Sequence, residues 1–242
     1  MVVLAALYIA FWFALSFWLT MFKRSSAFNI VTLLSVWVIL IVLLPASINN
    51  LVASVYPVPE ALRTMIKQRD GYHKKWDLDK KVTMDKFYAH YPQFKNYGVT
   101  DDNFWLWYYA MQQLGDDESS RESADLRQKL RARESMSRAI AFTIPTLHAQ
   151  MHLNDIARTS LVDYLRLLDA VSAFHEKKRL YFYPRIFENA DPKAEDWKKF
   201  TPELLGARQG IDWLSMIMPL ALMTMVLSSW GAMRRQYLSV EE

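Results

Sequence analysis

The stretch VLAALYIAFWFALSFWLTMF-KRSSAFN-IVTLLSVWVILIVLLPASIN, residues 3–49, decides the fold of this chain. A helix needs about 20 predominantly apolar residues to cross the hydrocarbon core of a bilayer. The first run supplies them without one charge, and the second supplies most of them. Lys23 and Arg24 lie in the short turn between the runs, and a charge at the bilayer centre costs about 2.5–3.5 kcal/mol. The sequence therefore predicts a transmembrane hairpin over residues 1–56, with spans at about 3–22 and 28–50.

Two other interpretations of the first run are weaker. A signal peptide would carry basic residues before the apolar run and a small-residue cleavage site after it, and the run has neither. A buried core helix is disfavoured because a globular core rarely needs two such runs back to back. We therefore expect both runs to span a membrane.

A third apolar run, Trp213–Met233, predicts one more transmembrane helix over residues 211–235. Lys and Arg in short flanking segments mark the cytoplasmic ends of spans. The predicted membrane-surface anchors on that side are Lys23, Arg24, Arg234 and Arg235. Span direction then alternates along the chain, which puts residues 57–210 outside the cytoplasm and residues 236–242 in a short cytoplasmic tail.

The same orientation places Met1 outside the cytoplasm. A chain that starts outside usually has earlier spans that brought it there, so we expect an odd number of crossings upstream of this start. The expected location is a plasma membrane, the inner membrane in a bacterium, crossed more than once.

Composition separates the membrane part from the rest. The chain has 242 residues, of which 52% are hydrophobic, but most of its charge lies in residues 60–210. A net charge of +4 is too weak to argue for nucleic acid as a partner. The chain has no cysteine, which excludes disulfides, thiol catalysis and thiolate metal sites.

The region between the second and third spans is expected to be helical, because the whole chain has only 6 glycines and no alternating strand pattern runs far. Expected helices cover Asn103–Leu114 and Arg121–Phe142, separated by a break or a solvated bend at residues 115–120. A further helix opens at Pro145, and a long one follows Thr159 or Ser160 and is limited by Pro184. Thr83 is expected to cap a shorter helix, Pro59 to open one, and Thr100 or Asp101 to cap the helix Asn103–Leu114. The fold class predicted is an all-α membrane protein with three transmembrane helices and a helical extracytoplasmic domain inserted between the second and third.

An ordered set of short segments extends over essentially the whole chain: Arg24-Ser25-Ser26-Ala27-Phe28-Asn29, Leu43-Leu44-Pro45, Tyr56-Pro57-Val58-Pro59, Pro145 before Gln150, and Thr159-Ser160 before Tyr164, Leu168, Phe174 and His175. This set resembles the C-terminal half of an ABC-2 type permease, from a branch with a large helical domain outside the membrane before the last span. The resemblance implies six spans in a complete subunit, a separate ABC ATPase that binds ATP, and a second permease half or a homodimer. The three spans here would match the last three of the family, and the spans that precede them in the family are missing.

Two groups of residues could form sites. His148 and His152 are four residues apart, as zinc ligands often are, but no Glu lies between them and no third ligand is evident, so we expect ordinary polar or core histidines and no metal. The consecutive large residues around Phe104, Trp105, Trp107 and Tyr108 cannot all face one side of a helix. They predict either a core helix packed on two sides, which we favour, or an apolar, lipid-facing surface.

Three classes of function remain. The first is a permease subunit, and the second is a membrane-anchored scaffold or receptor whose outer helical domain binds an envelope protein. The third, a membrane-bound hydrolase, lacks a nucleophile–base set. No ionisable residue lies well inside a span, and no phosphate loop is present, so ATP hydrolysis is expected in a partner chain and this chain is expected to be no enzyme, with no catalytic residue and no cofactor of its own.

Overall fold

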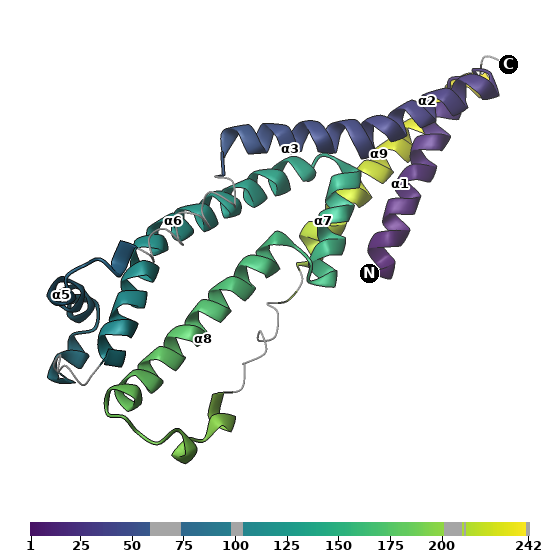
Figure 1. Cartoon of the computed structure of the whole chain (residues 1–242). Helices are drawn as coiled ribbons and strands as arrows, with labels where there is room; N and C mark the ends of the chain where they lie inside the picture. Colours follow the sequence, from purple (N-terminus) through teal and green to yellow (C-terminus); the bar gives the residue numbers. More distant parts are fainter. Residues whose placement is uncertain (59–73, 98–103, 201–209, 211, 241–242) are drawn as a thin grey trace. The chain divides into compact units, whose positions relative to one another are not determined.

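The chain is an all-α membrane protein (Figure 1). Its computed structural model describes residues 1–58, 74–97, 104–200, 210 and 212–240. Every regular element in these ranges is a helix, and three of the helical segments are long and apolar enough to cross a membrane. The helices expected at Pro59 and after Thr100 or Asp101 begin outside the described residues.

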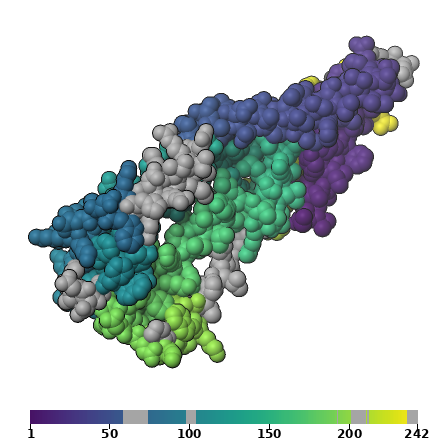
Figure 2. Space-filling view, in the orientation of Figure 1, coloured from purple at the N-terminus to yellow at the C-terminus, as the bar shows by residue number. Residues whose placement is uncertain are grey.

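The first two spans form the expected hairpin. Helix α1 covers Val2–Thr20, and the second span runs through α2 (Ser26–Val38), the π-helical segment η1 (Ile39–Leu43) and α3 (Leu44–Val55). The hydroxyl of Ser25 caps α2 by accepting a hydrogen bond from the backbone N–H of Phe28. No residue in the most apolar window of the second span is buried, and Figure 2 shows this span on the surface along its length. Its apolar side chains are therefore left for lipid or for another membrane chain.

The third span lies in α9, Trp213–Val240, and its apolar part is Trp213–Arg235. Helix α9 packs along α1 and runs in the same direction. Near their starts, Leu4 of α1 is buried with Met216 and Leu220 of α9. Near their ends, the rings of Trp18 and Trp230 are 5.9 Å apart. Spans one and three are therefore parallel, as the alternating topology requires.

The described contacts divide the chain into two compact units. Unit 1 comprises Met1–Pro57, Leu130–Tyr164 and Ala207–Glu242, and unit 2 comprises Val58–Lys129 and Leu165–Gly206. From the sequence we predict residues 57–210 to be one domain, whereas in the structure residues 130–164 cluster with the membrane spans. The two long helices α6 (Phe104–Ala141) and α8 (Leu161–Phe187) each contribute to both units.

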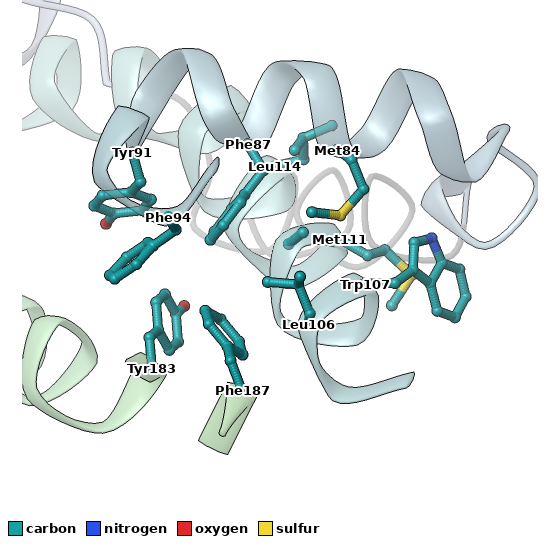
Figure 3. Close-up of a cluster of buried hydrophobic side chains, with 11 residues drawn as sticks. Met84, Phe87, Tyr91, Phe94, Leu106, Trp107, Met111, Leu114, Tyr183 and Phe187 are labelled. Atoms are coloured by element: carbon teal, nitrogen blue, oxygen red, sulfur yellow. The ribbon is translucent and has the colours of Figure 1, made fainter. Parts of the chain in front are cut away.

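Unit 2 is built around an aromatic core (Figure 3). Its elements are α5 (Lys80–His90), η2 (Pro92–Tyr97), the first part of α6, most of α8, and the short 3₁₀ turns η3 (Pro192–Ala194) and η4 (Trp197–Phe200). Phe87 is fully buried and stacks on Phe94, with ring centroids 6.1 Å apart. Tyr183 and Phe187 of α8 complete the cluster. Burying an aromatic side chain of this size removes 150–250 Å² from water, so these contacts hold unit 2 together.

Helix α6 runs for 38 residues without interruption, so the break or bend expected at residues 115–120 is absent. The acidic residues there do not form a solvated turn. Glu118 pairs with Lys75, Asp117 lies 2.9 Å from the His90 ring nitrogen, and Asp116 pairs with Arg179 of α8. Partners from several elements stabilise the helical path, which the local sequence alone does not favour.

Two helix ends also differ from expectation. Asp79 caps α5 by accepting from the backbone N–H of Lys81 at 2.7 Å, and Thr83 instead lies buried inside that helix. Helix α8 continues through Pro184 to Phe187, one turn beyond the expected limit. Ser160 caps α8, as one of the two expected candidates, because its hydroxyl accepts from the backbone N–H of Asp163 at 3.3 Å.

Candidate functional site: a polar helix among the spans

Helix α7, Pro145–Ala157, lies within unit 1 and contacts α1, α9 and the π-helical segment η1. Pro145 occupies the first turn, where its missing N–H costs nothing. Arg158 ends the helix in the left-handed conformation with φ of 58°. A helix of 13 residues is too short to cross a bilayer, so α7 is held by its contacts with the longer helices.

The first polar contact of α7 reaches the second span. A π-helical turn shifts the backbone hydrogen-bond register and often marks a functional position in a helix. The Thr146 hydroxyl donates to the carbonyl oxygen of Leu40, inside η1, at 2.8 Å. In a bilayer an unpaired carbonyl costs several kcal/mol, so a side-chain donor at an irregular turn stabilises that turn.

The second polar contact reaches the third span. His148 Nε2 lies 3.0 Å from the carbonyl oxygen of Met216 in α9, and the side chain of His148 is buried. Pro219 follows within the same turn and has no backbone N–H, which weakens the ladder there. Because the partner is an acceptor, the imidazole donates from Nε2. Burial lowers the pKa of His148, so the ring is neutral at pH 7.

A bidentate ion pair fixes α7 to the C-terminal part of α6. Arg138 donates from its two terminal nitrogens to the two carboxylate oxygens of Asp155, both at 2.7 Å, and also contacts Glu134. Burial alone would raise the pKa of Asp155, but the hydrogen bonds and charge of Arg138 bring it below its usual value. Such planar, paired contacts are among the stronger side-chain interactions in proteins.

The same part of α6 also reaches the end of the second span. Arg133 donates from Nε to the carbonyl oxygen of Tyr56 at 2.7 Å, directly after α3. Cationic donors near a helix C-terminus satisfy its last carbonyls and complement its dipole. Within unit 1, three basic or polar side chains thus connect one segment, residues 133–148, to the second and third spans.

The contacts of this arrangement bind helices to one another and fix their positions. His148 and His152 do lie together, with ring centroids 4.4 Å apart, but His148 is engaged by Met216. Across the described ranges, no group of three or more His, Cys, Asp or Glu side chains converges as a metal site would require. We call this set of contacts the junction: the hydrogen bonds of Arg133, Thr146 and His148 and the ion pair of Arg138 with Asp155, which join the α6–α7 segment and the spans.

The predicted surface anchors lie at the ends of α1 and α9. Lys23 and Arg24 are exposed just after α1, and Lys23 has a positive φ of 49°. The Arg234 guanidinium lies over the ring of Phe22, 4.1 Å from its centroid, and Arg235 is exposed. The basic ends of the first and third spans therefore lie at the same end of the α1–α9 pair.

The aromatic segment of α6 divides between core and surface in unit 2. Trp107 is buried and packs edge-on against Trp76, with ring centroids 5.5 Å apart. Phe104 and Trp105 are each 49% exposed, and Tyr108 is half-buried. The segment thus contributes to the core and also leaves two large apolar side chains on the surface of unit 2.

Sequence reasoning missed Thr146, Arg138 and Asp155 as members of the junction. The proline at position 219 was a usable indication, because it implies an unpaired carbonyl in the third span. The carbonyl that Pro219 leaves without its helical donor is that of Ser215, four residues earlier. The contact that the structure shows, from His148 to the neighbouring carbonyl of Met216, was not predictable, since His148 and Met216 are 68 residues apart along the chain.

An all-α chain with three membrane-spanning helices and a large helical region between the second and third defines a multi-pass membrane protein. The family model described as "Domain of unknown function (DUF3526)" matches residues 62–202, more than half of the chain, and the chain belongs to this family. No curated protein matches the chain, and neither does any solved structure. The matched region covers α5 to α8 and none of the three spans.

Proposed function

We propose that this chain is a membrane permease subunit, or part of one, of an ABC-2 type ATP-driven exporter. A separate ATPase subunit powers it, because the sequence has no phosphate-binding loop. A second permease half or a second copy of this chain completes the assembly. The proposal rests on the resemblance of the ordered segments and on one structural observation that agrees with it.

That observation is the parallel packing of α1 and α9. It brings Lys23, Arg24, Arg234 and Arg235 to one end of the helix pair, which under the positive-inside rule is the cytoplasmic end. An even number of crossings returns the chain to the same side, so the region between the second and third spans belongs on the opposite, extracytoplasmic side. This is the topology of the C-terminal half of the resembling permeases.

The junction built by α7 has a role in this proposal. A transporter must move its spans relative to one another during its cycle. A membrane helix with an irregular turn, whose carbonyls accept hydrogen bonds from side chains, can bend there while its other backbone hydrogen bonds stay intact. The second span has a π-helical turn at η1 and the third span contains Pro219, and α7 supplies a hydrogen bond to Leu40 in η1 and one to Met216, three residues before Pro219. We infer that α7 couples these two spans during transport.

One observation favours a second candidate function, a membrane-anchored scaffold whose helical region binds an envelope protein. Phe104 and Trp105 are each 49% exposed on unit 2, and aromatic side chains are enriched in protein interfaces. This candidate needs no ATPase and no movement of the spans.

Affinity purification separates the two candidates. The tagged chain is expressed in its native host, purified in mild detergent and analysed by mass spectrometry, with an unrelated three-span protein carrying the same tag as control. The permease proposal expects an ATPase with a phosphate loop in near one-to-one ratio. The double variant Phe104→Ser with Trp105→Ser should retain that ATPase. Recovery of envelope proteins alone, lost in the double variant, would contradict the permease proposal and favour the scaffold.

A further inference from the structure

Unit 2 contains a cleft between α6 and α8 that the proposed function does not use. It consists of two adjoining pockets of about 350 Å³ and 390 Å³. The two pockets lie side by side, because four residues line both of them: Tyr109, His175, Arg179 and Tyr183. Binding sites for small molecules usually have volumes of about 300–1,000 Å³, so each half is large enough to hold one.

The two ends of the cleft differ in polarity. Phe182, Ile186 and Trp197 line only the first pocket, and the rings of Phe182 and Trp197 are stacked, with centroids 5.4 Å apart and planes inclined by 22°. Gln112, Asp116 and Ser119 line only the second pocket. A cleft with one apolar end and one polar end is complementary to a molecule that is itself amphiphilic.

Basic side chains outnumber acidic ones in the lining of the cleft. The basic lining residues are His175, Lys178, Arg179 and Arg185, whereas the acidic ones are Asp116 and Glu195. Arg179 pairs with Asp116, and Arg185 pairs with Glu195, so both carboxylates already have a partner. The Lys178 ammonium lies 4.6 Å from the centroid of the Phe174 ring and, within the part of the chain that the structure describes, pairs with no carboxylate.

Tyr183 adds a hydrogen-bonding group to this region. Burial raises the pKa of Tyr183 to about 12, so its hydroxyl remains protonated at neutral pH. A protonated phenol can donate a hydrogen bond to an anion, and the ammonium of Lys178, in the same lining, adds attraction.

We propose that this cleft binds a single-chain anionic amphiphile, with its acidic head beside His175 and Lys178 and its apolar chain against Phe182, Ile186 and Trp197. The site requires no ATPase and no second subunit. It therefore goes beyond the permease proposal, and either of the two can fail without the other.

A photoreactive fatty acid tests the site. The full chain is placed in nanodiscs of phosphatidylcholine, incubated with a diazirine-bearing fatty acid, irradiated, and digested for peptide mapping by mass spectrometry. The lipid-exposed spans provide an internal control, because they take up the probe whether or not the cleft binds it. We expect additional labelling within residues 175–197. Labelling confined to the spans would overturn the proposal.

Two variants test the apolar end. Ile186→Trp fills the pocket and should remove the labelling of residues 175–197 while the spans are labelled as before. Because Ile186 also packs against the aromatic core, Trp197→Ser serves as a second variant at a 61% exposed position. It removes one wall of the pocket and should lower the labelling as well. Unchanged labelling of residues 175–197 in both variants, with native helicity, would contradict the assignment.

A charge reversal tests the acidic head. Lys178→Glu should reduce labelling by the fatty acid about fivefold or more, since an attraction becomes a repulsion. Lys177→Glu makes the same change on the next residue, which does not line the cleft, and should leave labelling unchanged. The methyl ester of the probe, which has no charge, should respond equally to both variants. Equal loss of fatty-acid labelling in both variants would show that Lys178 does not contact the head.

Discussion

His148 is a neutral hydrogen-bond donor to a membrane-spanning helix that contains a proline. The spacing of His148 and His152 suggested a possible metal pair only weakly, and the structure shows a different use for His148. Its Nε2 atom meets the Met216 carbonyl in the turn that contains Pro219. Charging a buried imidazole is costly, which keeps the His148 ring neutral at pH 7, and the His152 ring lies next to it with centroids 4.4 Å apart.

This residue predicts a pH dependence of stability. The pKa of folded His148 lies below its ordinary value of 6.5. Below pH 6.5 the unfolded chain therefore binds a proton that the folded chain resists, and the free energy of unfolding falls as the pH is lowered. His148→Gln keeps an N–H donor but does not titrate, so its stability should vary less between pH 7 and pH 5. The melting temperature in nanodiscs, followed by tryptophan fluorescence, measures this.

The matched control is His175→Gln, on the exposed surface of α8. It should retain the pH dependence of the unmodified chain. If His148→Gln and the unmodified chain lose stability in parallel on acidification, His148 is not the titrating group.

At the scale of elements, hydropathy and caps predict most helices but not their continuity. The spans, the start of α7 at Pro145 and the cap of α8 at Ser160 follow from local residues. The path of α6 through residues 115–120 does not, because Gly115 and three acidic residues locally favour a break. Pairing with Lys75, His90 and Arg179 overrides that preference, and such long-range contacts are not visible in the sequence.

Two glycines in helices give opposite predictions. Gly231 lies in the contact between α9 and α1, where an added Cβ would approach the Phe17 ring to 2.7 Å. Gly231→Leu should overpack this contact and destabilise the chain by about 1–3 kcal/mol. Gly115 lies in α6 with nothing within 4 Å of an added Cβ. Gly115→Ala should stabilise the chain by about 0.5–1 kcal/mol, because alanine is the better helix former.

Thermal unfolding of the two variants, side by side with the unmodified chain, measures both effects. A Gly231→Leu protein as stable as its parent would contradict the close packing of α1 on α9. A destabilised Gly115→Ala protein would contradict the uninterrupted course of α6.

At the scale of the whole molecule, the three spans were predictable because the thickness of the bilayer sets the length of an apolar helix. The parallel packing of α1 and α9 agrees with the alternation of crossings. The assignment of residues 130–164 to the same unit as the spans was not predictable, because it arises from contacts such as Arg133 with Tyr56 and Thr146 with Leu40. Neither contact leaves a periodic pattern in the sequence.

The permease and scaffold proposals both depend on the chain crossing the membrane with the helical region on the side opposite the basic ends. The chain has no cysteine, so single cysteines can be introduced without any background. Ser172→Cys, exposed on α8, and Ser26→Cys, exposed at the start of α2, report on the two sides. In intact cells, or in spheroplasts for a bacterial host, a membrane-impermeant maleimide should label Ser172→Cys, and it should label Ser26→Cys only after permeabilisation. Labelling of both cysteines from one side would contradict the transmembrane hairpin and the topology derived from it.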